Sequence, residues 1–200
     1  LHIKFYSSYS FRFVNFFFSI SGLGKISFTI LSFFGSGVLF FSTFFATLIL
    51  GSFIFVPLIG LIGGISWVST VDDYKLLNEG VNKHLGANNF IECLIYSLNF
   101  QKIREHLDND NDWESITKMI VDVSKHLENG GAKAWVLCAN TSHYIADNIA
   151  KEISIPIIHI ATETAHEINR NNLKKVGLLG TKFTMQYDFF KDKLKAKGIE

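Results

Sequence analysis

The pattern of apolar and polar positions divides the chain into two unlike parts. From residue 56 onward, short apolar runs alternate with amphipathic stretches, which is typical of an α/β domain with a parallel sheet flanked by helices. The apolar runs predict five strands, at residues 58–62, 91–98, 134–138, 157–160 and 175–179. The amphipathic stretches predict helices at residues 69–85, 112–129, 144–152, 162–171 and 184–197.

Polar and glycine residues mark the ends of two of these helices. In the helix over 69–85, Asp72 and Asp73 are expected in the first turn and Gly86 just beyond the end, as the helix dipole and the C-cap favour. The helix over 112–129 stops at Gly130 and Gly131. The glycines and the acidic residues therefore lie where helix ends favour them.

The chain also contains a short internal repeat. The run IGLIGG at 59–64 is matched by VGLLGT at 176–181, each an apolar strand that ends in a turn of small residues before a helix. This repeat predicts two related lobes, of which the second has only begun when the sequence stops at Glu200.

The front part, residues 1–55, is of a different kind. Fifteen of the 20 phenylalanines lie before residue 58, and residues 26–71 carry no charge. Residues 34–53 have the length and apolar character of a transmembrane helix. The alternative is a non-native translation product, because Phe, Leu, Ile and Ser are what AT-rich sequence encodes. We accordingly divide the chain into a hydrophobic extension, 1–55, and a folded domain, 56–200.

Charge and cysteine usage exclude several classes of protein. The part from Asp72 to Glu200 carries 16 Lys and Arg against 18 Asp and Glu, without the basic cluster that a nucleic-acid binder needs. Two cysteines, Cys93 and Cys138, exclude a disulfide-rich secreted scaffold and a four-cysteine zinc site. A reduced cytoplasmic location fits best, with membrane anchoring through residues 34–53 as the alternative.

Candidate chemistry lies where the predicted strands end, because ligands of open α/β sheets bind beyond the carboxyl ends of the strands. After the first strand, Gly63 and Gly64 allow close approach of the backbone, and the hydroxyl-rich helix start that follows offers N–H donors. This turn is not G-x-G-x-x-G, so a dinucleotide site is poorly supported. Other polar side chains end the second and fifth strands, at Asn99 and Thr181.

The end of the third strand is the most informative stretch, with the sequence CANTSH at 138–143. A thiol near a helix start can have a lowered pKa and act as a base or nucleophile. The alternative interpretation is that Cys138 is a small buried apolar residue. For His143 the pattern indicates a helix start, with proton transfer as the lesser alternative.

These motifs together resemble the aspartate/glutamate racemase family, especially its broad-specificity amino-acid racemase branch. The resemblance covers residues 58–200 and is carried, in order, by IGLIGGISWVST, YKLLNEGVNKHLG, IYSLNF, VLCANTSH, IPIIHIATETA and KKVGLLGTKFTMQYDFF. It implies the Rossmann-like first lobe of a pseudo-symmetric two-lobe racemase fold, together with the start of the second lobe. It also implies racemisation of a free amino acid such as aspartate or glutamate, without pyridoxal phosphate, metal or other cofactor.

In this family two bases, usually cysteines, exchange the Cα proton from opposite faces. Here Ala139 occupies the usual place of the first base, and Cys138, the remaining catalytic candidate, lies one residue earlier. The second cysteine belongs to a Gly-Cys-Thr-Glu stretch expected beyond Glu200. The resemblance assigns substrate binding to strand-end residues, namely Ile65, Ser66, Asn99, Ala139, Asn140, Thr141 and Thr181.

Two other functions remain open at this point. The scaffold could serve a one-base isomerase or decarboxylase, which would turn over a malonate or maleate. It could also serve a non-catalytic amino-acid-binding relative in which the first base has been replaced by Ala139. A homodimer is a further expectation, because the family often forms dimers.

Overall fold

The computed structural model describes residues 19–20, 26–27 and 56–200. In the front part it places β1 (Ser19–Ile20) antiparallel to β2 (Ile26–Ser27). The membrane segment predicted at residues 34–53 lies outside the described residues. Among the residues that are described, no helix has the length and hydrophobicity needed to cross a bilayer.

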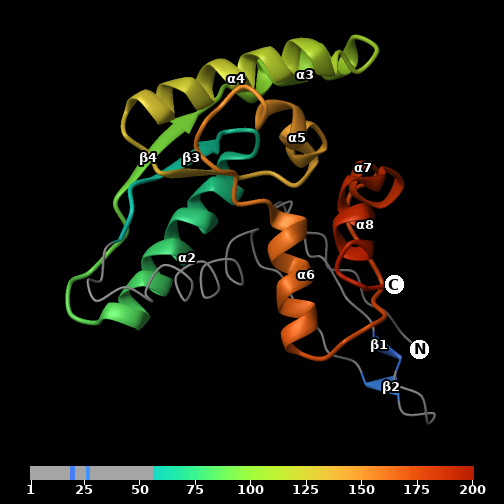
Figure 1. The fold of residues 1–200 in the computed structure, drawn as a ribbon. Coiled ribbons are helices and arrows are strands. Elements are labelled where there is room, and N and C mark those ends of the chain that lie inside the picture. Colours follow the sequence, from blue (N-terminus) through green and yellow to red (C-terminus); the bar gives the residue numbers. More distant parts are fainter. Residues whose placement is uncertain (1–18, 21–25, 28–55) are drawn as a thin grey trace.

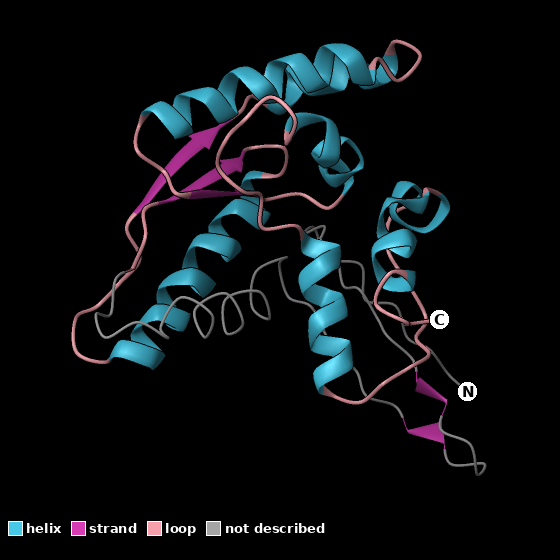
Figure 2. Ribbon diagram, in the orientation of Figure 1, coloured by secondary structure: helices cyan, strands magenta, loops and turns pink. Residues whose placement is uncertain are grey.

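A parallel sheet with β3 in the middle organises residues 56–200 (Figure 2). It consists of β4 (Cys93–Ser97), β3 (Ile59–Gly63) and β5 (Ala134–Leu137), in that order. The α/β fold with a parallel sheet that the sequence predicts is therefore confirmed.

The helices cover both faces of this sheet. The crossover from β3 to β4 and the crossover from β4 past β3 to β5 run in opposite directions across the sheet. Two right-handed crossovers of opposite direction put their helices on opposite faces. Accordingly α2 (Trp67–Leu85) lies on one face, and α3 (Phe100–Asp108) and α4 (Trp113–Asn129) on the other (Figure 1).

Alternation along the strands divides the core into two clusters. Ile59 and Leu61 of β3 point toward α2, where they pack with Leu77 and Val81. Ile62 points the other way, into the cluster formed with α4. Every residue of β3 is buried, as expected of a central strand covered by helices on both sides.

The helix boundaries follow side-chain caps. Ser66 accepts a hydrogen bond from the Ser69 N–H and starts α2 at Trp67, two residues before the predicted start. Asp72 and Asp73, expected in the first turn, therefore lie one turn further along, and Asp73 is buried. Asp112 likewise caps α4, where the prediction was nearly correct.

Two elements differ from expectation near the second and fourth predicted strands. The pattern missed α3, a nine-residue helix that Asn99 caps through its side-chain oxygen. The strand expected at 157–160 was wrong, since it is reduced to one parallel bridge between Ile157 and Trp135. The preceding Pro156 lacks an N–H, and His159 already caps the next helix, α6 (Ile160–Arg170), so no room remains for a strand.

The carboxyl-terminal elements also differ from the prediction. The expected helix over 144–152 begins earlier, as a 3₁₀ turn η1 (Thr141–Ile145) that continues into α5 (Ala146–Ile149). The helix expected at 184–197 is two helices, α7 (Lys182–Gln186) and α8 (Asp188–Lys195), because Tyr187 between them is extended.

Residues 175–179, predicted as a strand, do not form one. Their backbone bonds instead to the last residue, since Val176 donates to the Glu200 carbonyl (2.7 Å) and Glu200 donates to the Lys174 carbonyl (2.8 Å). This is the hydrogen-bond pattern of a parallel pair one residue long. A strand needs a partner along its length, which this segment has at one position only among the described residues.

A close approach of two backbones follows β3. The Gly63 carbonyl accepts a hydrogen bond from the Leu98 N–H (2.9 Å), and Gly64 has a φ of +82°. A Cβ on Gly64 would lie 2.1 Å from the Leu98 carbonyl oxygen, a distance that backbone atoms cannot relieve by a rotamer change. Only glycine fits at Gly64, so the Gly-Gly turn locks the end of β3 onto the segment after β4.

Replacing Gly64 by alanine is therefore expected to destabilise the protein strongly. The backbone clash adds to the unfavourable positive φ, so Gly64→Ala should lower the free energy of unfolding by at least about 3 kcal/mol. Gly86→Ala is the matched control, because Gly86 has a φ of +70° and nothing within 4 Å of its Cβ position. The free energy of unfolding of Gly86→Ala should fall by only about 1 kcal/mol. Urea unfolding followed by circular dichroism measures both, and equal losses would contradict the proposed clash.

Two buried histidines join η1 to the start of α6. The rings of His143 and His159 meet edge-on with centroids 4.8 Å apart, and neither residue is more than 6 % exposed. Burial is the main cause that lowers the pKa of His159 to about 4 and the pKa of His143 well below its usual range. Both imidazoles are thus neutral in the folded protein at pH 7.

This pair makes stability depend on pH below neutrality. In the unfolded chain His159 binds a proton as the pH falls through 6.5. In the folded protein the same ring is protonated only when the pH falls to about 4. The free energy of unfolding should therefore fall by about 3 kcal/mol from this residue between pH 7 and pH 4.

Urea titrations at pH 7, 6 and 5 test the dependence. With His159→Gln, the free energy of unfolding should fall less between pH 7 and pH 5, because the buried ring with the lowered pKa is gone. If the free energy of unfolding of His159→Gln fell with pH as steeply as that of the wild type, His159 would not be the source of the pH dependence.

Candidate functional site

The carboxyl ends of the three strands bring the expected site residues to one edge of the sheet. Ile65 and Ser66 follow β3, Asn99 follows β4, and Ala139 and Asn140 follow β5. The geometry of this edge is set by hydrogen bonds between the three loops.

Side chains from the first turns of α2 tie the loops together. The Ser69 hydroxyl donates to the Cys138 carbonyl (2.7 Å), across 69 positions of sequence. The Thr70 hydroxyl accepts from the Gly64 N–H (3.0 Å) and is placed to donate to the Ser66 carbonyl (3.0 Å). Sequence reasoning missed Ser69 and Thr70, although both belong to the hydroxyl-rich start of this helix.

The start of α2 presents donors at this edge. Ser66 is the cap residue, and Ile65 lies partly buried between it and the Gly-Gly turn. A helix amino terminus carries partial positive charge and N–H groups that point out of the helix. This part of the edge can therefore hold a carboxylate.

Asn99 and Thr181 both serve as helix caps. Asn99 is exposed, and its side-chain oxygen accepts from the Gln101 N–H (3.0 Å), which starts α3. Thr181 accepts from the Thr184 N–H (3.2 Å) and starts α7. Each oxygen is already used by the helix that follows it, which leaves less of its bonding capacity for a ligand.

Aromatic rings connect the α7–α8 segment to the first lobe. Tyr144 of η1 lies 4.7 Å from Tyr187 between ring centroids, and Trp113 at the start of α4 lies 6.2 Å from Phe183 of α7. The Lys193 ammonium on α8 also pairs with Asp147 on α5 (2.9 Å). These contacts set the position of the Thr181 turn beside η1.

Cys138 faces away from the loops and into the core. Its side chain belongs to the cluster on the α2 face and is 1 % exposed. Burial raises the pKa of the Cys138 thiol well above its usual value, and the Asp73 side chain, which hydrogen-bonds to the thiol, raises it further. A thiolate beside a buried carboxyl is unfavourable, so the thiol stays protonated at pH 7.

The next residues form the exposed part of this loop. Ala139, Asn140 and Thr141 are all partly accessible. The side-chain oxygen of Asn140 is nevertheless buried and has no hydrogen-bond partner among the described residues. A buried acceptor without a donor is unfavourable, so this oxygen is the candidate acceptor for a ligand N–H or a water molecule. Ala139 has no ionisable group to contribute.

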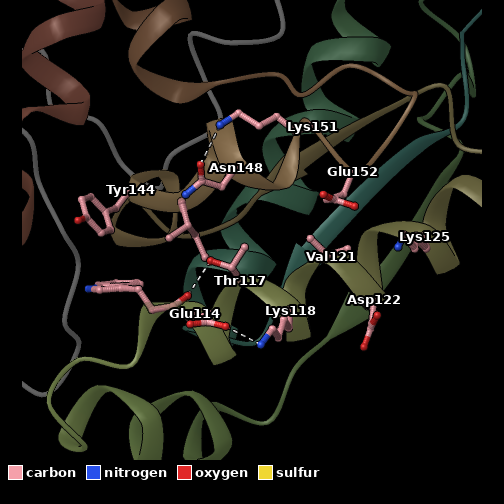
Figure 3. A pocket seen from close by; sticks show the side chains of 12 residues that line it. Glu114, Thr117, Lys118, Val121, Asp122, Lys125, Tyr144, Asn148, Lys151 and Glu152 are labelled. Atoms are coloured by element: carbon pink, nitrogen blue, oxygen red, sulfur yellow. Dashed lines mark hydrogen bonds and ion pairs between the residues drawn. The ribbon is translucent and has the colours of Figure 1, made fainter.

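A separate groove of about 830 Å³ lies between α4 and the η1–α5 segment (Figure 3). It is lined by three lysines and three acidic residues, namely Lys118, Lys125, Lys151, Glu114, Asp122 and Glu152. Lys118 is already paired with Glu114 (2.7 Å). The groove includes none of the strand-end residues, so we place the candidate site at the strand ends on the basis of chemistry rather than size.

The strand-end loops therefore combine a buried amide oxygen with a helix amino terminus. In the described part of the chain, no group of three or more His, Cys, Asp or Glu residues is arranged to hold a metal. The acceptor on Asn140 and the donors at the start of α2 suit the two ends of a zwitterion such as a free amino acid. The geometry supports binding more directly than proton transfer.

The chain is similar to proteins of one known family. Residues 62–200 match the model of the Asp/Glu/hydantoin racemase family. The chain is 31 % identical over 146 residues to the broad specificity amino-acid racemase RacX of Bacillus subtilis, a match that covers 72 % of this chain and 63 % of RacX.

Solved structures of similar proteins share the fold. A candidate Asp/Glu racemase from Yersinia pestis superposes with a TM-score of 0.68 at 37 % identity, covering 72 % of this chain and 63 % of that one. An aspartate racemase homologue from Pyrococcus horikoshii superposes with a TM-score of 0.61 at 32 % identity, covering 71 % and 62 %.

The chain thus spans less than two thirds of the length of these relatives. Residues 62–200, which match the family model, include β4, β5, the Gly-Gly turn and the Cys138 to Thr141 loop. On the evidence of the family model and of RacX, the chain belongs to the Asp/Glu/hydantoin racemase family.

Proposed function

We propose that the protein binds a free amino acid at the carboxyl edge of its sheet and acts as a cofactor-independent amino-acid racemase. The observation that carries this proposal is the hydrogen bond between the loop after β3 and the loop after β5. The Ser69 hydroxyl, at the start of α2, donates it to the Cys138 carbonyl. The unpartnered oxygen of Asn140 lies in the second loop. The similarity to RacX supports an amino acid as substrate, and the family model supports aspartate or glutamate.

The arrangement fits the chemistry of Cα proton transfer. The Cα proton of an amino acid is weakly acidic, and fixing the carboxylate against N–H donors stabilises the negative charge that forms when the proton leaves. The start of α2 would hold that carboxylate, and Asn140 would accept a hydrogen bond from the ammonium group. Inversion then needs one base on each face of Cα.

The residues around the first-base position favour a second candidate function. Ala139 cannot move a proton, and the nearby thiol of Cys138 is buried, bonded to Asp73 and held protonated. A protein with one base, placed elsewhere in the complete fold, would remove and return the proton on the same face. With an amino acid such a protein exchanges the Cα proton without inverting the centre; with a malonate, a one-base decarboxylase would lose CO2 and then protonate the carbanion that remains. A protein without any base is an amino-acid-binding protein.

Deuterium exchange in heavy water separates these functions. With the complete gene product and L-aspartate or L-glutamate, a two-base racemase incorporates deuterium at Cα and forms the D-isomer at comparable rates. A one-base enzyme exchanges the proton and retains configuration. Binding without exchange would refute the proposed catalysis and leave the binding protein. The measurement combines proton NMR with chiral chromatography.

The variant Cys138→Ala tests the role of the thiol in any exchange that occurs. Because the thiol is buried and its pKa is raised, we expect the exchange rate to stay within about threefold of the wild type. A loss of two or more orders of magnitude would instead identify Cys138 as the base.

A paired substitution tests the binding residues. Asn140→Ala removes the unpartnered acceptor and should weaken amino-acid binding roughly tenfold without lowering the free energy of unfolding. Asn99→Ala removes the cap of α3, so it should lower the free energy of unfolding by about 1 kcal/mol. Its effect on binding should be small. Isothermal titration calorimetry and urea unfolding give the two quantities, and an unchanged affinity in Asn140→Ala would contradict the assignment.

A further inference from the structure

His143 makes a specific hydrogen bond to the residue at the first-base position. Its Nδ1 atom lies 3.1 Å from the carbonyl oxygen of Ala139. A carbonyl oxygen can only accept, so Nδ1 carries the proton and the neutral ring is the Nδ1–H tautomer. Burial, which lowers the pKa of His143, keeps it in that form. Its Nε2 atom is buried and without a partner among the described residues.

Three successive carbonyl groups of this loop are consequently held. Ser69 donates its hydroxyl to the Cys138 carbonyl (2.7 Å), and the His143 ring donates to that of Ala139. The backbone N–H of His143 donates to the Asn140 carbonyl (3.0 Å). The first two bonds come from side chains on different elements, so the shape of the loop depends on these side chains and not on its own backbone alone.

Holding the Ala139 carbonyl also fixes the next N–H. The carbonyl of Ala139 and the N–H of Asn140 belong to one planar peptide group, in which they point in opposite directions. Once His143 holds the carbonyl on the buried side, the Asn140 N–H and the start of its side chain have a set direction. The Asn140 side chain carries the oxygen proposed to accept from the substrate ammonium group, so its position depends on how this peptide is held.

We propose that His143 is a positioning residue that orients the Ala139–Asn140 peptide for amino-acid binding by donating its Nδ1 proton to the Ala139 carbonyl. This inference rests on the proposed function. His159 supports the arrangement, because its ring packs edge-on against the His143 ring. The Nδ1 atom of His159 accepts from the Ala161 N–H (3.2 Å), which fixes that second ring at the start of α6.

Two isosteric variants test the proposal. The side-chain amide nitrogen of asparagine lies close to the position of imidazole Nδ1, whereas that of glutamine lies close to Nε2. His143→Asn should therefore keep the bond to the Ala139 carbonyl, and His143→Gln should lose it. With L-glutamate and L-aspartate as ligands of the complete gene product, we expect affinity within about twofold of wild type for the first and a loss of roughly tenfold for the second.

Stability and hydrogen exchange separate positioning from general packing. If both variants unfold at similar urea concentrations while only His143→Gln loses affinity, a packing role does not explain the difference. Amide exchange at Asn140 and Thr141 should be faster in His143→Gln than in His143→Asn, whether or not ligand is present. Equal affinity, or equal exchange rates, in the two variants would overturn the proposal.

A measurement on the unmodified protein covers the case in which a variant does not fold. Long-range proton–nitrogen NMR of the histidine rings distinguishes the two neutral tautomers. We expect the Nδ1–H tautomer for His143 at pH 7, and the Nε2–H tautomer or a charged ring would overturn the inference. If the wild type binds no amino acid, the proposed function fails, while the tautomer and the exchange rates still decide whether His143 orients this peptide.

Discussion

The structure depends on the contact between the Gly-Gly turn and the segment after β4. The Gly63 carbonyl accepts from the Leu98 N–H, and Gly64 passes so close to Leu98 that a side chain has no space. This contact fixes where α2 begins. The start of α2 in turn places Ser69 within hydrogen-bond distance of the Cys138 carbonyl, so the first contact also determines the position of the loop after β5.

Periodicity predicted the elements whose own residues decide their structure. The buried runs of β3 and β5 and the apolar faces of α2 and α4 are visible in the sequence, and their ends are set by local caps such as Ser66 and Asp112. One failure is an element that depends on a partner. The strand expected at 175–179 pairs with Glu200 at a single position, and a pattern of apolar residues does not reveal whether a neighbour is present.

The candidate site was predictable in outline but not in its hydrogen bonds. The rule that ligands bind at the carboxyl edge of a parallel sheet selected the loops after all three strands. The bond from Ser69 spans 69 positions, and the bond from His143 depends on a 3₁₀ turn where a helix start was expected. Neither has a signature in local composition.

The titratable groups beneath this edge share one property, which bears on how the protein works. Burial raises the pKa of the Cys138 thiol and lowers the pKa of the His143 and His159 rings. All three groups are therefore neutral at pH 7, and none offers a charge that would compete with a bound zwitterion. In the proposed function, the helix amino terminus at one end of this edge and the amide oxygen at the other orient an amino acid without moving its protons. In that function these loops therefore bind and orient the amino acid, and the group that removes the Cα proton is a side chain other than these three.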